Sequence, residues 1–252
     1  MFNLPKTINE VIDHLDKIVI DAINERNRIG YFAALYLRVT VEVRDKINED
    51  FFENSQLIEK LDVAFANRFL EAYYKYKDQE PVTASWQVAF DSTNSWHPLV
   101  IQHLFLGMNA HIGLDLGIAA ASVCPGESIE KLYGDFIKIN AILSSMVNKV
   151  QDNLASIWPI LKLIDCLAGK LDEEIAKFSI EIARDAAWKV ALDFAKIQNT
   201  KEQFDYIENR DNKVSNFSNK LYRPGFLLSS LIVLIRIGET GTVAGKIRKL
   251  TS

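Results

Sequence analysis

The sequence contains few of the features that assign a protein quickly to a functional class. Only two of its 252 residues are cysteines and only four are histidines. The cysteines, Cys124 and Cys166, lie in apolar surroundings and show no CxxC spacing, which argues against a disulfide framework and favours a reducing, cytoplasmic setting. There is no phosphate-binding loop of the GxxxxGKS/T type and no GxSxG nucleophile elbow. The sequence therefore lacks these two common motifs of nucleotide binding and serine hydrolysis.

The sequence also has only a small excess of charge of one sign. The formal net charge is −4, and the basic residues are scattered apart from the short terminal stretch GKIRKLTS. A dedicated nucleic-acid binder usually carries a basic face, so nucleic acid is not an expected partner. The N-terminal stretch MFNLPKTINEVIDHLDK has acidic residues where an export signal needs a continuous apolar run. We therefore expect a cytoplasmic protein.

What the sequence does have is helical periodicity, and no convincing set of alternating strands accompanies it. Capping-box patterns occur at Thr7–Glu10 and at Thr200–Gln203, and Gly30 interrupts the first apolar stripe. Connections are short, and no stretch is polar enough to mark a domain boundary. The chain is predicted to be one all-α domain, residues 1–252, a bundle of about ten helices around a buried central helix at about 98–123.

Two apolar runs raise the question of a membrane span. Leu99–Ala121 is long enough to cross a bilayer, but it contains Gln102, His103 and Asp115 among its polar residues, which would be costly in lipid. Phe226–Ile237 is short for a span. Both runs are predicted to be core helices, and no membrane span is expected.

The central helix concentrates polar groups on an apolar background. Between Asp91 and Glu127, Asp115 is the one formally charged residue, and three of the four histidines lie in the same stretch. His111 and Asp115 are one helical turn apart on the same face, a spacing that suits either a shared metal ion or a hydrogen bond in which Asp115 fixes the histidine tautomer. His103 lies two turns earlier and cannot share an ion with that pair on a straight helix.

Other residues add weaker indications. Gly107 lies midway between His103 and His111, where a glycine favours close approach of another backbone or of a ligand. Asn109 belongs to a separate polar stripe that suits hydrogen bonds to a neighbouring helix. Arg38 is spaced for a surface ion pair with Glu42. Asp62 and Arg68 could direct charge towards the core.

The stretches GYFAALYLRVTVEVRDKI, LDVAFANRFLEAYYKY and HLFLGMNAHIGLDLGIAAA resemble a bacterial, all-helical family of unknown function with an LGxNAHIxxDL-type motif. The resemblance covers roughly residues 25–200 and implies no assigned activity. It places the family's motif on His103, Gly107, Asn109, His111 and Asp115, with further members at Tyr36, Arg38, Thr40, Asp62 and Arg68. Gly113 stands where a polar residue is more usual, which removes one potential ligand.

Three functional interpretations remain open. In a small-molecule enzyme, such as a metal-assisted hydrolase, His111 and Asp115 would hold a divalent metal or act as a base and its orienting group, with His103 as a second proton-transfer group and Asn109, Arg38, Asp62 and Arg68 as binding residues. In a non-enzymatic binding protein, Tyr73, Tyr74 and Tyr76 would suit the rim of a ligand pocket. In a structural protein, the His–Asp motif would only fix helix packing. The substrate, the metal and the oligomeric state are not determined by the sequence.

Overall fold

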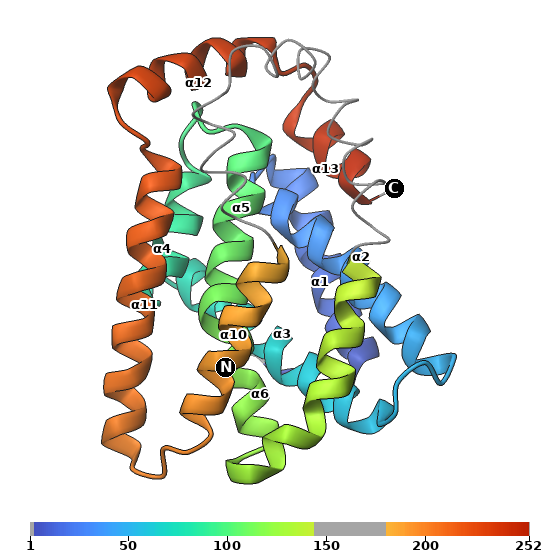
Figure 1. Ribbon diagram of the computed structural model, residues 1–252. Helices are drawn as coiled ribbons and strands as arrows, with labels where there is room; N and C mark the ends of the chain where they lie inside the picture. Colours follow the sequence, from blue (N-terminus) through green and yellow to red (C-terminus); the bar gives the residue numbers. More distant parts are fainter. Residues whose placement is uncertain (1–2, 144–179, 252) are drawn as a thin grey trace.

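The computed structural model describes residues 3–143 and 180–251, and in these ranges the chain folds into helices without a strand (Figure 1). The predicted all-α fold is confirmed. Residues 133–143 are also helical. The other helices are α1 Ile8–Glu25, α2 Ile29–Asn48, α3 Ser55–Lys77, α4 Ala84–Ser92, α5 Val100–Ala110, the π-helix His111–Leu116, α6 Gly117–Val123, the 3-10 helix Gly126–Leu132, α10 Ile180–Phe194, α11 Thr200–Tyr222, α12 Phe226–Gly238 and α13 Val243–Thr251.

The central helix is continuous from Val100 to Val123, but its middle turn is a π-helix. It begins two residues later than predicted, because Pro98 precedes the helix and Leu99 is the N-cap. Figure 1 shows α5 in the middle of the bundle, between α11 on one side and α2 on the other. In the described part of the chain, this is the one continuous helix long and apolar enough to cross a membrane, and 83% of its most apolar window is buried inside the protein. Burial of this kind is typical of a core helix, so the length and apolar composition of this helix are weak evidence for a membrane span.

Several predicted helix ends are wrong for identifiable reasons. Gly30 does not break a helix but lies in the first turn of α2, while α1 ends at Glu25 and its C-cap residue Arg26 adopts the left-handed conformation (φ 54°). Asn199, rather than Thr200, caps α11, because its side-chain oxygen accepts from two backbone N–H groups of the first turn. The apolar periodicity after Pro125 predicts a long amphipathic helix from Glu127 to about Ser156, but its first part is a 3-10 helix. The helix continues as predicted through residue 143, and the rest of its predicted length to Ser156 lies outside the described residues. The sequence pattern also predicts a short helix at 159–167, which lies outside them too, and a long helix from Asp172 to Gln198, whose start does.

Glycines allow the central helix to pack closely against its neighbours. A Cβ atom on Gly107 would lie 2.5 Å from the ring of Phe32 on α2. A Cβ atom on Gly117 would lie 2.6 Å from the backbone oxygen of Ala187 on α10. Real Cβ contacts are not this short, so the absent side chains set how near α2 and α10 approach. Gly107 does allow a close approach, but the neighbour is the side chain of Phe32 rather than the backbone or the ligand that the sequence suggested.

Substitution of Gly117 tests this packing. Gly117→Ala is expected to lower the free energy of unfolding by about 1–3 kcal/mol, because the new methyl group meets backbone that cannot move aside cheaply. Gly134→Ala is the matched control, since its nearest neighbour would lie at 3.6 Å, an ordinary contact. That control is expected to gain roughly 0.5–1 kcal/mol from the helix propensity of alanine. Urea denaturation measures both, and equal effects in the two variants would contradict the packing argument.

Candidate functional site

The carboxylate of Asp115 is the centre of a buried hydrogen-bond network. Its side chain is 2% exposed, and three groups surround it. Arg68 on α3 donates from Nε to Oδ1 at 2.7 Å, and Trp86 on α4 donates from its indole N–H to Oδ2 at 2.8 Å. His111 Nδ1 lies 3.3 Å from Oδ2. Burial raises the pKa of Asp115, but the positive charge of Arg68 and these hydrogen bonds outweigh it, so the pKa lies below its ordinary value. Asp115 is therefore ionised.

His111 is enclosed by aromatic rings. The ring of Phe65 stacks on it with centroids 3.5 Å apart, and the ring of Tyr36 meets it edge to face at 4.6 Å. Phe32, Phe69 and Trp86 complete the enclosure. Burial lowers the pKa of His111, so the imidazole is neutral. Because its partner is an ionised carboxylate, Nδ1 carries the proton and donates it, which leaves a lone pair on Nε2. No described residue hydrogen-bonds to Nε2.

The π-helix contains both members of this pair. It runs from His111 to Leu116, and such wide turns occur mostly as short segments that are frequent at functional sites. The predicted pairing of His111 with Asp115 across four residues is confirmed as a hydrogen bond. The π-turn itself was not predicted, because residue spacing alone does not distinguish it from a regular α-turn.

A pocket of about 390 Å³ reaches this network from the surface. It lies between α3 and the start of α4, and its polar lining residues are Arg68, Glu71, Lys75, Thr83, Trp86 and Asp115. Lys75 pairs with Glu71 at 2.6 Å, so the charges of these two residues offset each other. The Thr83 hydroxyl is buried and has no hydrogen-bond partner among the described residues. His111 does not line the pocket, so a molecule in it would meet the carboxylate and its donors first.

A second buried carboxyl group, Asp62 on α3, lies in a different electrostatic environment. Its pKa is raised to about 7, first by burial and then by the negative charge of Glu59. Its Oδ2 atom has no hydrogen-bond partner in the described ranges. Asp62 in turn contributes, after burial, to raising the pKa of the Tyr36 hydroxyl well above its ordinary value. The predicted charge near the core is present, but at Asp62 protonation neutralises about half of it near pH 7.

His103 belongs to another part of the core. Its Nδ1 lies 3.1 Å from Ser92 Oγ, and its ring lies 5.7 Å from that of Tyr31. Burial, reinforced by nearby positive charges, lowers the pKa of His103 to about 3. No hydrogen bond or ring contact joins it to His111 within the described residues. The prediction that the two histidines could not share one ion agrees with this separation.

Two further predicted binding residues have structural partners instead. The amide of Asn109 donates to the backbone oxygen of Val214 at 3.0 Å and to Ser218 Oγ at 2.9 Å, so it joins the central helix to α11, as its polar stripe suggested. Arg38 donates to the backbone oxygen of Leu250 at 3.3 Å rather than pairing with Glu42. The expected surface ion pair of Arg38 is therefore wrong, since the C-terminal helix α13 packs over α2 and supplies a carbonyl group.

The donor set at Asp115 is poorly suited to a metal ion. In the described ranges, no group of three or more His, Cys, Asp or Glu side chains is arranged to hold one. Arg68 also places a positive charge directly on the carboxylate that a cation would need.

Sequence reasoning missed Trp86, Phe65 and Thr83, because no spacing links them to residue 115. A tryptophan in a short apolar helix was the one available signal, since a buried indole N–H usually needs an acceptor.

The fold and site together define an all-helical protein whose central helix carries a buried Arg–Asp–His network at the end of a small pocket. The family described as "Family of unknown function (DUF5995)" matches residues 8–224, and the chain belongs to that family. The match extends beyond the predicted range of 25–200. No curated protein and no solved structure matches the chain.

Loss of Arg68 tests the electrostatics of the network. Arg68→Met is expected to lower the free energy of unfolding at pH 7 by about 2–3 kcal/mol, because Asp115 would keep a buried charge with one partner fewer. Arg44→Met is the matched control, since Arg44 is equally exposed at 29% but pairs with a half-exposed Asp45. That change should cost less than about 0.5 kcal/mol.

The loss of stability in Arg68→Met should also depend on pH. The pKa of Asp115 is lower in the folded protein than in the unfolded chain, so its ionised form stabilises the fold. This contribution to the free energy of unfolding is complete above the unfolded-state pKa of about 4 and is lost as the pH falls through the folded-state pKa. The Arg68→Met deficit should therefore shrink in acid. Urea denaturation from pH 7 down to pH 3 measures it, and a deficit independent of pH would contradict the proposed charge pairing.

Asp62 should show the opposite pH dependence. Its folded pKa of about 7 lies above the unfolded value, so the native state keeps a proton that the unfolded chain has released, and stability falls as the pH rises from about 4 to 7. Asp62→Asn is expected to raise the free energy of unfolding at pH 8 by on the order of 3 kcal/mol and to change little at pH 4. Asp16→Asn, at an exposed site on α1, is the control. An equal gain at both pH values would refute this interpretation.

Proposed function

We propose that the protein binds a small molecule carrying an anionic group in the pocket that ends at Asp115. The observation that supports this function is that the pocket reaches the buried carboxylate of Asp115 and the partly exposed guanidinium of Arg68. Pockets that join a few convergent polar groups to an apolar surround are typical ligand sites.

The charge of the ligand follows from the groups that remain available. Both oxygens of Asp115 already accept hydrogen bonds. Arg68 uses only Nε on the carboxylate, so its remaining N–H groups can donate to a ligand. The Thr83 hydroxyl is a second available donor. Two donors beside a cationic guanidinium favour a carboxylate or phosphate oxygen.

Acid–base catalysis is the more specific function that the same site could support. His111 offers a neutral imidazole whose Nε2 lone pair has no partner among the described residues, and Asp115 fixes its tautomer. A substrate would have to displace part of the aromatic enclosure to reach it, since His111 lies outside the pocket lining. Metal-assisted hydrolysis has less support, because Arg68 occupies the carboxylate. Elemental analysis of the purified protein and of His111→Gln would test the metal directly.

Titration with small anions tests the binding function. Inorganic phosphate, acetate and succinate are added to ¹⁵N-labelled protein while the indole N–H resonance of Trp86 is followed, because Trp86 lines the pocket. At least one anion is expected to shift this resonance saturably. Thr83→Val should weaken its binding about five- to tenfold, the value of roughly one hydrogen bond. This substitution spares the helix cap, because the Thr83 side chain makes no capping bond.

Thr200→Val, at an exposed threonine of α11, is the control and should bind as the wild type does. His111→Gln separates the two functions, since binding should survive while any turnover that depends on Nε2 should be lost. Absence of a saturable shift with all three anions would overturn the proposal.

A further inference from the structure

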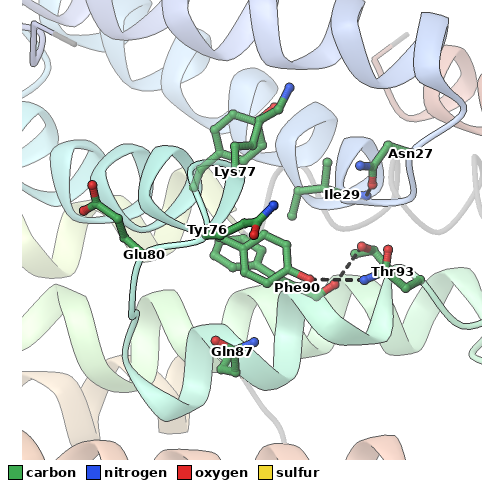
Figure 2. Close-up of a pocket in the computed structure, with 11 residues that line it drawn as sticks. Asn27, Ile29, Tyr76, Lys77, Glu80, Gln87, Phe90 and Thr93 are labelled. Atoms are coloured by element: carbon green, nitrogen blue, oxygen red, sulfur yellow. Dashed lines mark hydrogen bonds between the residues drawn. The ribbon is translucent and has the colours of Figure 1, made fainter. Parts of the chain in front are cut away.

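A second pocket, of about 510 Å³, lies on a different part of the surface and shares no lining residue with the Asp115 pocket (Figure 2). It is bounded by the turn between α1 and α2, by the C-terminal end of α3, and by α4. Its volume falls within the range of about 300–1,000 Å³ that is common for small-molecule sites.

The lining of this pocket is rich in side-chain amides. Asn27, Gln79, Gln87 and Asn94 all contribute to it. A carboxamide offers both donors and an acceptor without carrying a charge. A hydroxyl group likewise donates and accepts, so an amide-lined surface matches a ligand with several hydroxyl groups better than it matches an ion.

Hydrogen bonds already orient three of these amides. Asn27 Oδ1 accepts from the backbone N–H of Ile29 at 3.0 Å, which leaves its NH₂ group available. Gln87 donates to Asp91 at 2.9 Å and Asn94 donates to the Tyr76 hydroxyl at 3.1 Å, so each keeps its oxygen as an acceptor. Donors and acceptors are thus held in fixed places before a ligand arrives, which reduces the entropy lost on binding.

The fourth amide is positioned by the backbone. Gln79 has a φ of 61°, in the left-handed region, and lies in the turn that ends α3. The backbone N–H of Glu80 donates to the carbonyl of Lys75 at 2.8 Å, which closes this turn. The exposed Gln79 side chain makes no hydrogen bond with the described residues and stands at the pocket edge.

Aromatic rings supply the apolar part of the pocket. Tyr76 and Phe90 pack with ring centroids 4.8 Å apart, and Figure 2 shows them together at the centre of the lining. The Tyr76 hydroxyl donates to Asp91 at 3.0 Å, which fixes the orientation of the ring. Tyr73 also lines the pocket. A pyranose ring presents an apolar C–H face and a rim of hydroxyl groups, and aromatic surface beside amides is complementary to both.

The lining carries no excess of positive charge that would attract an anion. Its two charged residues, Lys77 and Glu80, have opposite signs, and Lys77 lies 3.5 Å from Glu25. From the amides and the aromatic rings, we propose that this pocket is a carbohydrate-binding site that takes a neutral sugar unit.

Saturation-transfer NMR on the full-length protein tests the site with methyl glucoside, N-acetylglucosamine, maltose and cellobiose as probes. At least one sugar is expected to receive saturation and to bind saturably. The double variant Gln79→Gly, Gln87→Met should weaken that binding at least about tenfold, since it removes two hydrogen-bonding groups. Glycine suits the left-handed backbone at position 79, and methionine keeps the length of the side chain at position 87.

Gln56→Met, at an exposed glutamine in the first turn of α3, is the matched control and should bind like the wild type. Circular dichroism of each variant confirms that the fold is kept. Three outcomes would overturn the proposal: no sugar binds, the double variant binds as well as the wild type, or inorganic phosphate displaces the sugar. Because the two pockets share no lining residue, Thr83→Val should leave sugar binding unchanged, and failure of one proposal would not imply failure of the other.

Discussion

A buried negative charge on the central helix is the constraint on which the middle of this structure depends. Asp115 is almost completely removed from water, and such a charge is tolerated only when partners replace its hydration. Arg68 comes from α3 and Trp86 from α4, so satisfying one carboxylate fixes two surrounding helices against the central one. The position of the pocket between α3 and α4 follows from this arrangement.

Two buried carboxyl groups illustrate how the surroundings determine the charge. Asp115 has a cation and an indole N–H as partners, and its pKa is lowered despite its burial. Asp62 is also buried, lacks a partner on Oδ2 and has Glu59 nearby, so its pKa is raised to about 7. Because a buried charge is favourable only with compensating groups, one of these residues is suited to hold a permanent charge and the other to exchange a proton.

The two pockets are joined by a direct aromatic contact. Trp86 lines the pocket at Asp115 and Phe90 lines the amide-rich pocket, and their rings stack with centroids 5.1 Å apart on α4. One pocket is built on charge and the other on neutral amides, so the physical chemistry favours different ligands. Helices α3 and α4 both contribute lining residues to each pocket, so these two helices connect the two proposed functions.

The sequence by itself determined the helical class, the central apolar helix, and the pairing of His111 with Asp115, because these depend on local periodicity and on spacing within one helix. Of the three tyrosines suggested for a pocket rim, Tyr73 and Tyr76 line a pocket and Tyr74 does not, while Tyr73 is also part of the hydrophobic core. Only the tertiary structure decided that Arg68 and Trp86 complete the network, that Arg38 bonds to the backbone of α13, and which groups Asn109 and His103 contact. These outcomes depend on which helix faces meet, and residues far apart in the chain carry no local pattern that records such contacts.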